Sequence, residues 1–192
     1  MTAAPIPLAD KVSLLNGALD AAAIPYAFGG ALALAYYAEP RATIDIDVNV
    51  FIAPDAIQPL VSVLEELGVG LSGADRRVIR RDGQIRLPWD RTPLDLFFAY
   101  DDFHFNAARR IRRVPFGEIT IPILAAEDLL VCKAVFDRRK DWIDIDQILL
   151  LTSGSVRVDD VRNWLVAIVG ADDARVNRFD AAVNEVLGPQ SA

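Results

Sequence analysis

Cysteine and histidine are nearly absent from this chain of 192 residues, which contains one of each. A single cysteine excludes an internal disulfide and any zinc site built on several cysteines, and a single histidine excludes a two-histidine metal motif. Long hydrophobic runs are also missing, because the longest uncharged stretch, Ala21 to Ala38, contains Pro25 and Gly29-Gly30. The chemistry of this protein must therefore rest on carboxylates, Lys, Arg and the backbone.

A basic region followed by an apolar one is lacking at the N-terminus, which instead contains Pro5, Pro7 and Asp10. We therefore expect no secretory signal peptide. Hydrophobic residues form 53% of the chain, which argues against disorder and permits a packed core without metals or disulfides. These features predict a soluble, cytoplasmic protein with no membrane partner.

Positive charge is concentrated in one part of the chain, although the net charge is −7. Residues 76–140 contain 14 Lys and Arg against 9 Asp and Glu, a local net charge of +5. Arginine outnumbers lysine 17 to 3, and its guanidinium suits bidentate contacts with phosphate. Solvated arginines that balance nearby acids are the alternative interpretation. The candidate RNA-binding residues are Arg76, Arg77, Arg80, Arg81, Arg109 and Arg110.

Hydrophobic periodicity predicts an α+β fold over residues 1–125, followed by a helical part over residues 126–192, or one continuous domain. Asp55 is expected to cap a helix, and Asp82-Gly83 is expected to form the turn of a β-hairpin. The expected strands are Tyr26–Phe28, Ile44–Phe51, Val78–Ile79, Gln84–Leu87, Leu94–Tyr100 and Ile119–Leu124. The expected helices are 8–23, 31–37, 56–67, one that begins near Glu127, 142–151, one from Asp159 or Asp160 to Val169, and 172–187.

The alternating strand Ile44–Phe51 carries the strongest chemical signal, because Asp45 and Asp47 lie two residues apart and share one face. Two such carboxylates can hold one Mg²⁺ or bracket two ions. Asp95 lies alone in an apolar run, where a carboxylate is costly unless it is paired or binds metal. If its strand neighbours that of Asp45, three acids converge. The alternative is that Asp45 and Asp47 form the solvated face of an edge strand.

Two further groups point to a phosphate-containing substrate. Gly29-Gly30 precedes a short helix, where backbone N–H groups can approach an anion, although a plain strand-to-helix turn is an open alternative. Lys133 lies on an otherwise apolar helix, where it either extends its ammonium to solvent or reaches a phosphate. Asp141 and Asp144 share a helix face and can pair with neighbouring arginines or orient Lys133.

This combination of motifs resembles the minimal nucleotidyltransferase superfamily, and especially toxins of the AbiEii and MenT type. The resemblance spans about Ile24 to Leu151 and rests on Gly29-Gly30-x-Ala, Thr43-x-Asp45-x-Asp47, Asp95, Glu127-Asp128-Leu with Lys133, and Arg139-Lys-Asp141-x-x-Asp144. It implies a polymerase-β-like fold, a small mixed sheet flanked by helices with a helical C-terminal part. The family motif is usually Gly-Ser, so the absence of a hydroxyl at Gly30 predicts the loss of one phosphate contact.

The resemblance also implies roles for individual residues. The cofactor, Mg²⁺ or Mn²⁺, is implied to bind Asp45, Asp47 and Asp95. The NTP substrate is implied to contact Gly29, Gly30, Arg41, Thr43 and Lys133. The implied catalytic residues are Asp45, Asp47, Lys133, Asp141 and Asp144.

Relatives of the MenT type add nucleotides to the 3′ end of tRNA, so the resemblance implies an RNA acceptor, an antitoxin partner and the function of a toxin. It also implies regulation by phosphorylation of Thr43, against the alternative of a plain strand residue. Transfer to a small molecule or a protein side chain, and nucleotide binding without turnover, remain alternatives. His104 is expected at a surface turn and Cys132 in the core, neither with a chemical role.

Overall fold

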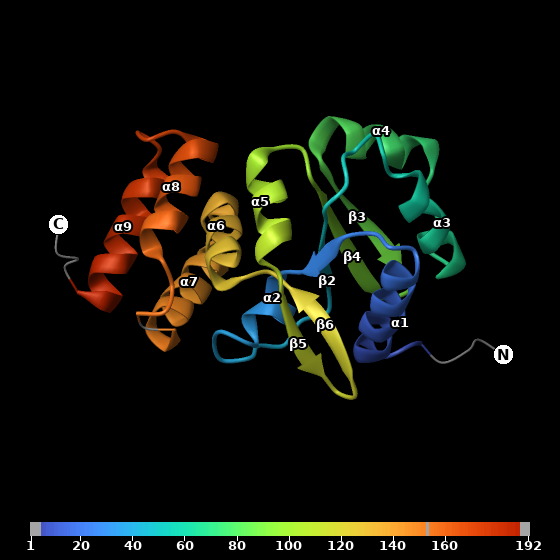
Figure 1. The fold of residues 1–192 in the computed structure, drawn as a ribbon, viewed down its shortest axis with the longest axis horizontal. Coiled ribbons are helices and arrows are strands. Elements are labelled where there is room, and N and C mark those ends of the chain that lie inside the picture. The colour runs from blue at the N-terminus through green and yellow to red at the C-terminus, as the bar shows by residue number, and fades with distance from the viewer. Residues whose placement is uncertain (1–4, 153, 189–192) are drawn as a thin grey trace. The chain divides into compact units, whose positions relative to one another are not determined.

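The computed structural model describes residues 5–152 and 154–188, and it divides the chain into two compact units. The first unit consists of Met1–Leu32 and Ala42–Ile123, and the second consists of Ala33–Arg41 and Leu124–Ala192. The first contains a mixed sheet with flanking helices, and the second is helical (Figure 1). The predicted α+β fold with a helical C-terminal part is therefore confirmed.

The sheet of the first unit has six strands in the order β3-β4-β2-β1-β6-β5. Strand β2 pairs in parallel with β4 and antiparallel with β1, so it lies inside the sheet. Its inner position excludes the edge-strand alternative for Asp47, and Asp45 directly precedes the strand. The strands are β1 Tyr26–Phe28, β2 Ile46–Val50, β3 Gln84–Trp89, β4 Thr92–Phe98, β5 Arg112–Phe116 and β6 Ile119–Ile123.

One face of this sheet forms an apolar core. Ile46, Val48 and Val50 of β2 are fully buried, and their register partners on β4 are also apolar. Helix α1, Leu8–Ala21, packs against this face, where Asn16 accepts a hydrogen bond of 2.6 Å from the Tyr26 hydroxyl. Because side chains alternate between faces along a strand, the odd-numbered residues of β2 lie on the opposite face.

The remaining helices of the first unit lie in the connections between strands. Helices α3, Gln58–Glu66, and α4, Gly73–Asp82, fill the crossover between β2 and β4 before the β3–β4 hairpin. Helix α5, Asp102–Arg110, follows β4. The short helix α2, Gly30–Leu34, follows β1 directly and carries the chain from the first unit into the second.

In the described part of the second unit, four helices follow the segment 33–41. They are α6 Ala126–Phe136, α7 Arg139–Leu151, α8 Val158–Val169 and α9 Ala174–Leu187. The Tyr37 hydroxyl donates to the Leu124 carbonyl at 2.8 Å, which ties segment 33–41 to the start of the helical chain. Within the described ranges, no helix is long and apolar enough to cross a membrane.

The hairpin expected at Asp82-Gly83 is wrong. Residues 73–82 form α4, which starts with a capping box between Ser72 and Asp75 and ends at Gly83 in the left-handed conformation. A glycine after a polar residue is typical of helix C-termini as well as of hairpin turns, and the capping box selects the helix here. The true hairpin turn is Asp90-Arg91, between β3 and β4.

Other local predictions also need correction. Asp55 does not cap α3, whose N-cap is Ile57, and it pairs with Arg80 instead. His104 lies in the first turn of α5, where its backbone N–H donates to the side chain of Asp101. Strand β2 begins at Ile46, and Ile44 is 73% exposed. Hydrogen bonds between the Thr43 hydroxyl and Asp45 replace strand pairing there.

Candidate active site

A row of polar residues crosses the face of the sheet that lies opposite α1. Asp47 of β2 is the register partner of Asp95 on β4, and Asp95 is the register partner of Arg86 on β3. Directly opposed residues share one face of a sheet, so the three side chains project to the same side. The strand of Asp95 does neighbour the strand that follows Asp45, which meets the condition for the three acids to converge.

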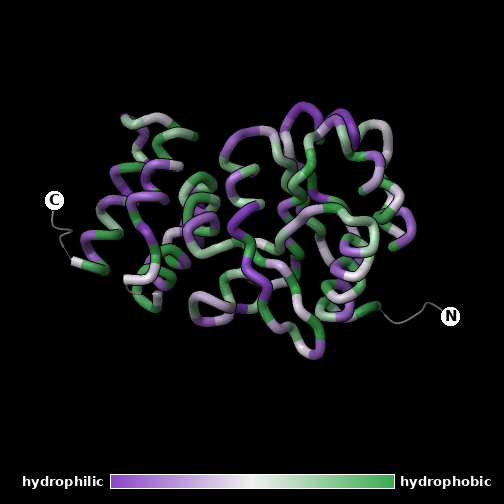
Figure 2. Tube along the Cα trace, in the orientation of Figure 1, coloured by the Kyte–Doolittle hydropathy of each residue, from purple (hydrophilic) through white to green (hydrophobic). Residues whose placement is uncertain are grey.

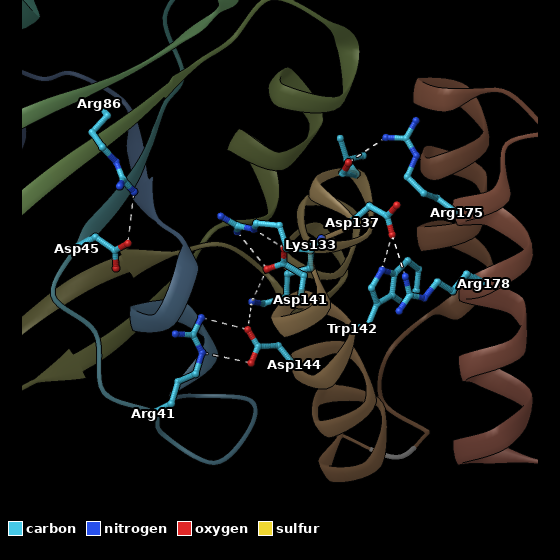
Figure 3. Close-up of polar contacts among 12 residues, drawn as sticks. Arg41, Asp45, Arg86, Lys133, Asp137, Asp141, Trp142, Asp144, Arg175 and Arg178 are labelled. Atoms are coloured by element: carbon cyan, nitrogen blue, oxygen red, sulfur yellow. Dashed lines mark hydrogen bonds and ion pairs between the residues drawn. The ribbon is translucent and has the colours of Figure 1, made fainter.

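Asp45 joins this row from the residue that precedes β2. Its carboxylate lies 3.6 Å from the guanidinium of Arg86 and accepts a hydrogen bond from the Thr43 hydroxyl. Figure 3 shows the contact between Asp45 and Arg86. Asp45, Asp95 and Thr43 are thus linked through one shared arginine and one hydroxyl.

Arg86 and Asp95 form a bidentate pair. The Nε and Nη2 atoms of Arg86 donate to the two carboxylate oxygens of Asp95 at 2.7 and 2.5 Å. This hydrogen bonding raises the pKa of Arg86. The negative charges of Asp95, Asp45 and Asp47 raise it further, whereas partial burial acts in the opposite direction. Arg86 therefore contacts the carboxylates of Asp95 and Asp45 at once, and the charge of Asp47 also acts on it.

Gly30 makes room for Asp47. Its backbone has φ +51°, and a Cβ atom placed on it would stand 1.9 Å from Oδ2 of Asp47. The Gly29 N–H donates to the Asp47 carbonyl at 2.9 Å, so the chain turns directly beside the aspartate. Only glycine fits this position, both for the backbone conformation and for the space.

A second cluster of charges lies in the second unit, at the junction of α6 and α7. Lys133 is 4% exposed, and its ammonium contacts Asp144 at 2.5 Å and Asp141 at 3.9 Å. Arg41 donates to both oxygens of Asp144 at 3.3 and 3.2 Å (Figure 3). Arg138 donates to Asp141 at 2.6 and 3.1 Å. Lys133 therefore does not extend to solvent, and the two aspartates act as its partners.

The sequence matches no protein-family model, and no curated protein matches it. Its structure is similar to two structures of ANT(2″)-Ia. The crystal structure of that protein in complex with adenylyl-2″-tobramycin is 16% identical with a TM-score of 0.59, and the match covers 83% of this chain and 97% of the other. The solution structure of the same antibiotic-resistance factor is 14% identical with a TM-score of 0.56 over 92% and 96% of the two chains. The lincosamide antibiotic adenylyltransferase LnuA, lincomycin-bound, is 14% identical with a TM-score of 0.52 over 78% and 100%.

This chain has the nucleotidyltransferase fold. The sheet that carries Asp45, Asp47 and Asp95 is thus part of the architecture expected from the resemblance. The narrower likeness to AbiEii and MenT toxins stays a prediction.

Within the nucleotidyltransferase fold of this chain, the donor set near Gly30 fits a divalent cation. Carboxylate oxygens are the ligands that Mg²⁺ and Mn²⁺ prefer; Asp47 supplies them directly beside Gly30, and Asp45 lies two residues before it in the chain. Asp95 is engaged by Arg86, and no three His, Cys, Asp or Glu side chains in the described ranges are arranged to hold a metal ion. The metal roles of the three aspartates therefore stay predictions, with Asp45 and Asp47 as the better-placed pair.

The predicted RNA-binding arginines lie on two helices and are partly engaged with neighbours. Arg76 donates to Gln58, Arg80 pairs with Asp55, and Arg81 forms a bidentate pair with Asp82. The last turn of α5 contains Arg109 and Arg110. Figure 2 shows strongly hydrophilic chain over α4 and from the end of α5 into β5. Arg77 completes the predicted set and is exposed on α4.

Arg86 is the residue that sequence reasoning missed. Arg86 and Asp95 are equally far from the Asp90-Arg91 turn, so they face each other across the hairpin. Opposite charges placed symmetrically about a two-residue turn are a usable signal, but only once the turn is located correctly. The wrong hairpin at Asp82-Gly83 concealed it.

Proposed function

We propose that this protein is a nucleotidyltransferase that uses a divalent cation to transfer a nucleoside monophosphate from an NTP to the 3′ end of an RNA, in the tRNA class. The observation that carries the proposal is the Asp47 carboxylate beside Gly30, with Asp45 two residues before it, in a chain with the nucleotidyltransferase fold. The RNA acceptor rests on the arginine clusters of α4 and α5 and on the resemblance to AbiEii and MenT toxins. We extend the proposal to the biological role of a toxin controlled by an antitoxin.

The chain's own groups would act mainly by binding and positioning. Asp45 and Asp47 would hold the cation, which would supply neutralisation of the triphosphate charge. The turn at Gly29 and Gly30 lets the triphosphate approach the backbone closely. The acceptor hydroxyl then attacks the α-phosphorus in line with the departing pyrophosphate, and its orientation accounts for much of the rate. The roles of Lys133, Asp141, Asp144 and Arg41 toward the nucleotide stay predictions.

A small-molecule acceptor is the second candidate, and a specific observation favours it. The similar structures include an adenylyltransferase bound to lincomycin and a resistance factor bound to adenylyl-2″-tobramycin. Moreover, Arg76, Arg80 and Arg81 already have partners within the protein, which reduces their capacity for phosphate.

The deciding experiment incubates the protein with each α-labelled NTP, Mg²⁺ or Mn²⁺, total RNA and a panel of hydroxyl-bearing antibiotics. Asp47→Asn is the negative control, because it removes a carboxylate of the proposed cation site. Label on tRNA supports the main proposal, and label on an antibiotic supports the second candidate. Label on protein, or in no fraction, contradicts transfer to RNA.

Charge reversal tests the RNA surface separately. Arg80→Glu with Arg81→Glu, and Arg109→Glu with Arg110→Glu, should weaken RNA binding, and salt should weaken the wild-type complex because phosphate contacts release counterions. RNA binding that responds to neither change would contradict an arginine–phosphate interface.

Phosphorylation of Thr43 would explain control by an antitoxin. The Thr43 hydroxyl contacts the carboxylate of Asp45, so a phosphate there would place a charge of about −1.5 to −2 beside the proposed cation site. We expect a sample phosphorylated at Thr43 to lose transferase activity and Thr43→Val to resist this inactivation. Full activity of the phosphorylated sample would contradict this regulation.

A further inference from the structure

Arg86 is placed to oppose the binding of the cation. It is not one of the groups that hold the cation or nucleotide in the proposed function. Its guanidinium nevertheless contacts two of the three aspartates, Asp95 at 2.5 Å and Asp45 at 3.6 Å, and lies on the face of the sheet that carries Asp47. A positive charge among these carboxylates needs an explanation, because it weakens their attraction for a second positive ion.

We propose that Arg86 is an internal competitor for the divalent cation, which holds Asp95 and balances the carboxylates until a cation takes over this role. The inference rests on the proposed function, since it assumes that Asp45 and Asp47 form the cation site. It adds a residue that sets the concentration of cation at which the site fills.

The competition follows from charge and geometry. Asp45, Asp47 and Asp95 carry three negative charges when ionised. Their mutual repulsion destabilises the site in the cation-free protein unless another positive charge lies among them. Arg86 supplies one positive charge and satisfies both oxygens of Asp95. A divalent cation brings two positive charges among the same carboxylates, so it takes over most of the neutralisation and repels the nearby guanidinium of Arg86.

Arg86 is also able to leave. Its side chain is 60% exposed, whereas the side chains of Asp45 and Asp95 are 25% and 13% exposed. The guanidinium ends a flexible stem at the sheet surface, so it can move to water once a cation balances the charge that it leaves on the less exposed aspartates. The aspartates are fixed by the strand and by the turn before it, so the arginine is the mobile partner.

The test measures Mn²⁺ binding in the absence of nucleotide, by following free Mn²⁺ with electron paramagnetic resonance. We compare wild-type protein with Arg86→Gln, Arg86→Lys, Arg91→Gln and Asp47→Asn. Arg91→Gln is the matched control, because it removes the same charge from the turn of the same hairpin. Circular dichroism confirms that each variant is folded. If Arg86→Gln is unstable, Arg86→Lys, which retains the charge, still tests the inference.

Arg86→Gln is expected to bind Mn²⁺ about threefold to tenfold more tightly than the wild type, a range typical of losing one nearby screened charge. Arg86→Lys should lie between the two, because a lysine keeps the charge but not the bidentate contact. Arg91→Gln should resemble the wild type. Equal affinities for wild type and both Arg86 variants, weaker binding by Arg86→Gln, or an equal gain in Arg91→Gln would overturn the inference.

The experiment also separates this inference from the proposed function. If the wild type binds Mn²⁺, Asp47→Asn does not, and the Arg86 variants are unchanged, the cation site stands and the competition is wrong. If no variant binds Mn²⁺, both are wrong. If the expected order of affinities is found but no label is transferred in the NTP assay, the competition stands and the transferase proposal fails.

Discussion

Asp47 lies against Gly30 so closely that a Cβ atom on the glycine would overlap its carboxylate, at 1.9 Å from Oδ2 and 2.5 Å from Cγ. The glycine also has φ +51°, a conformation that costs an L-residue about 1–2 kcal/mol. Gly30→Ala is therefore expected to displace Asp47 and to lower both Mn²⁺ affinity and nucleotidyl transfer by at least about tenfold. Mn²⁺ titration and the labelled-NTP assay measure the two effects.

Gly17→Ala is the matched control for that change. Gly17 lies within α1, and a Cβ atom there would meet no heavy atom within 4 Å. Alanine should raise the stability of the helix by about 0.5–1 kcal/mol and leave activity unchanged. A Gly30→Ala variant as active as Gly17→Ala would contradict the importance of the close approach to Asp47.

Lys11 is a buried residue whose contribution is structural. It is 1% exposed, and its ammonium donates to the Trp89 carbonyl at 2.5 Å and the Thr92 hydroxyl at 3.2 Å, and contacts Asp90 at 3.2 Å. Lys11→Met keeps the aliphatic stem but leaves the polar groups of the β3–β4 turn without this donor. We expect a loss of about 1–3 kcal/mol in the free energy of unfolding, measured by urea denaturation. An unchanged midpoint would show that water replaces the ammonium fully.

Substitutions in the buried pair of Lys133 and Asp144 can separate a structural role of this pair from a catalytic one. Lys133→Met leaves the carboxylate of Asp144 with Arg41 alone and should destabilise the second unit by about 3–5 kcal/mol. Replacing both residues, Lys133→Met with Asp144→Leu, should recover much of that loss, because an apolar pair of similar volume avoids the cost of burying charge.

Activity then shows whether Lys133 also contributes to transfer. If the predicted catalytic role is correct, the double variant is stable but inactive, with denaturant midpoints and labelled-NTP rates measured on the same samples. A stable double variant with wild-type rates would leave Lys133 and Asp144 with a structural role alone.

Asp173 is expected to contribute to the free energy of unfolding in a pH-dependent way. It caps α9, and the hydrogen bonds from the Arg175 side chain and backbone lower the pKa of Asp173 to about 2. Since the folded-state pKa lies below the unfolded value of about 3.9, the contribution is complete above pH about 4 and is lost as the pH falls through about 2. The difference in stability between wild type and Asp173→Asn should shrink over that window in thermal melts. A difference independent of pH there would contradict this assignment.

Local sequence patterns predicted most of the helices and strands. Strand β1 lies over the predicted residues, and the helical repeat of the C-terminal part predicted four helices there. Helix α5 and strand β5 were missed, because Asp101-Asp102 and Arg109–Arg113 look like a polar loop when the cap and the strand pairing are unknown.

The candidate site was predictable only in part. The alternation around Asp45 and Asp47 was visible in the sequence, and so was the isolation of Asp95 in an apolar strand. Arg86 was not, because its relation to Asp95 depends on strand register, which a wrong turn position shifts. Asp141 and Asp144 were visible as possible partners of Lys133, and the distances of 3.9 Å to Asp141 and 2.5 Å to Asp144 make Asp144 the nearer one.

The two units are interleaved along the chain, because residues 33–41 belong with Leu124–Ala192 although they lie within the first part of the sequence. Neither unit can be excised as one uninterrupted fragment. A protein shortened after residue 125 would keep Arg41 but lose its partner Asp144. Separate expression of the sheet unit would require a linker that joins residues 32 and 42, and the helical unit would have to regain residues 33–41 as a graft.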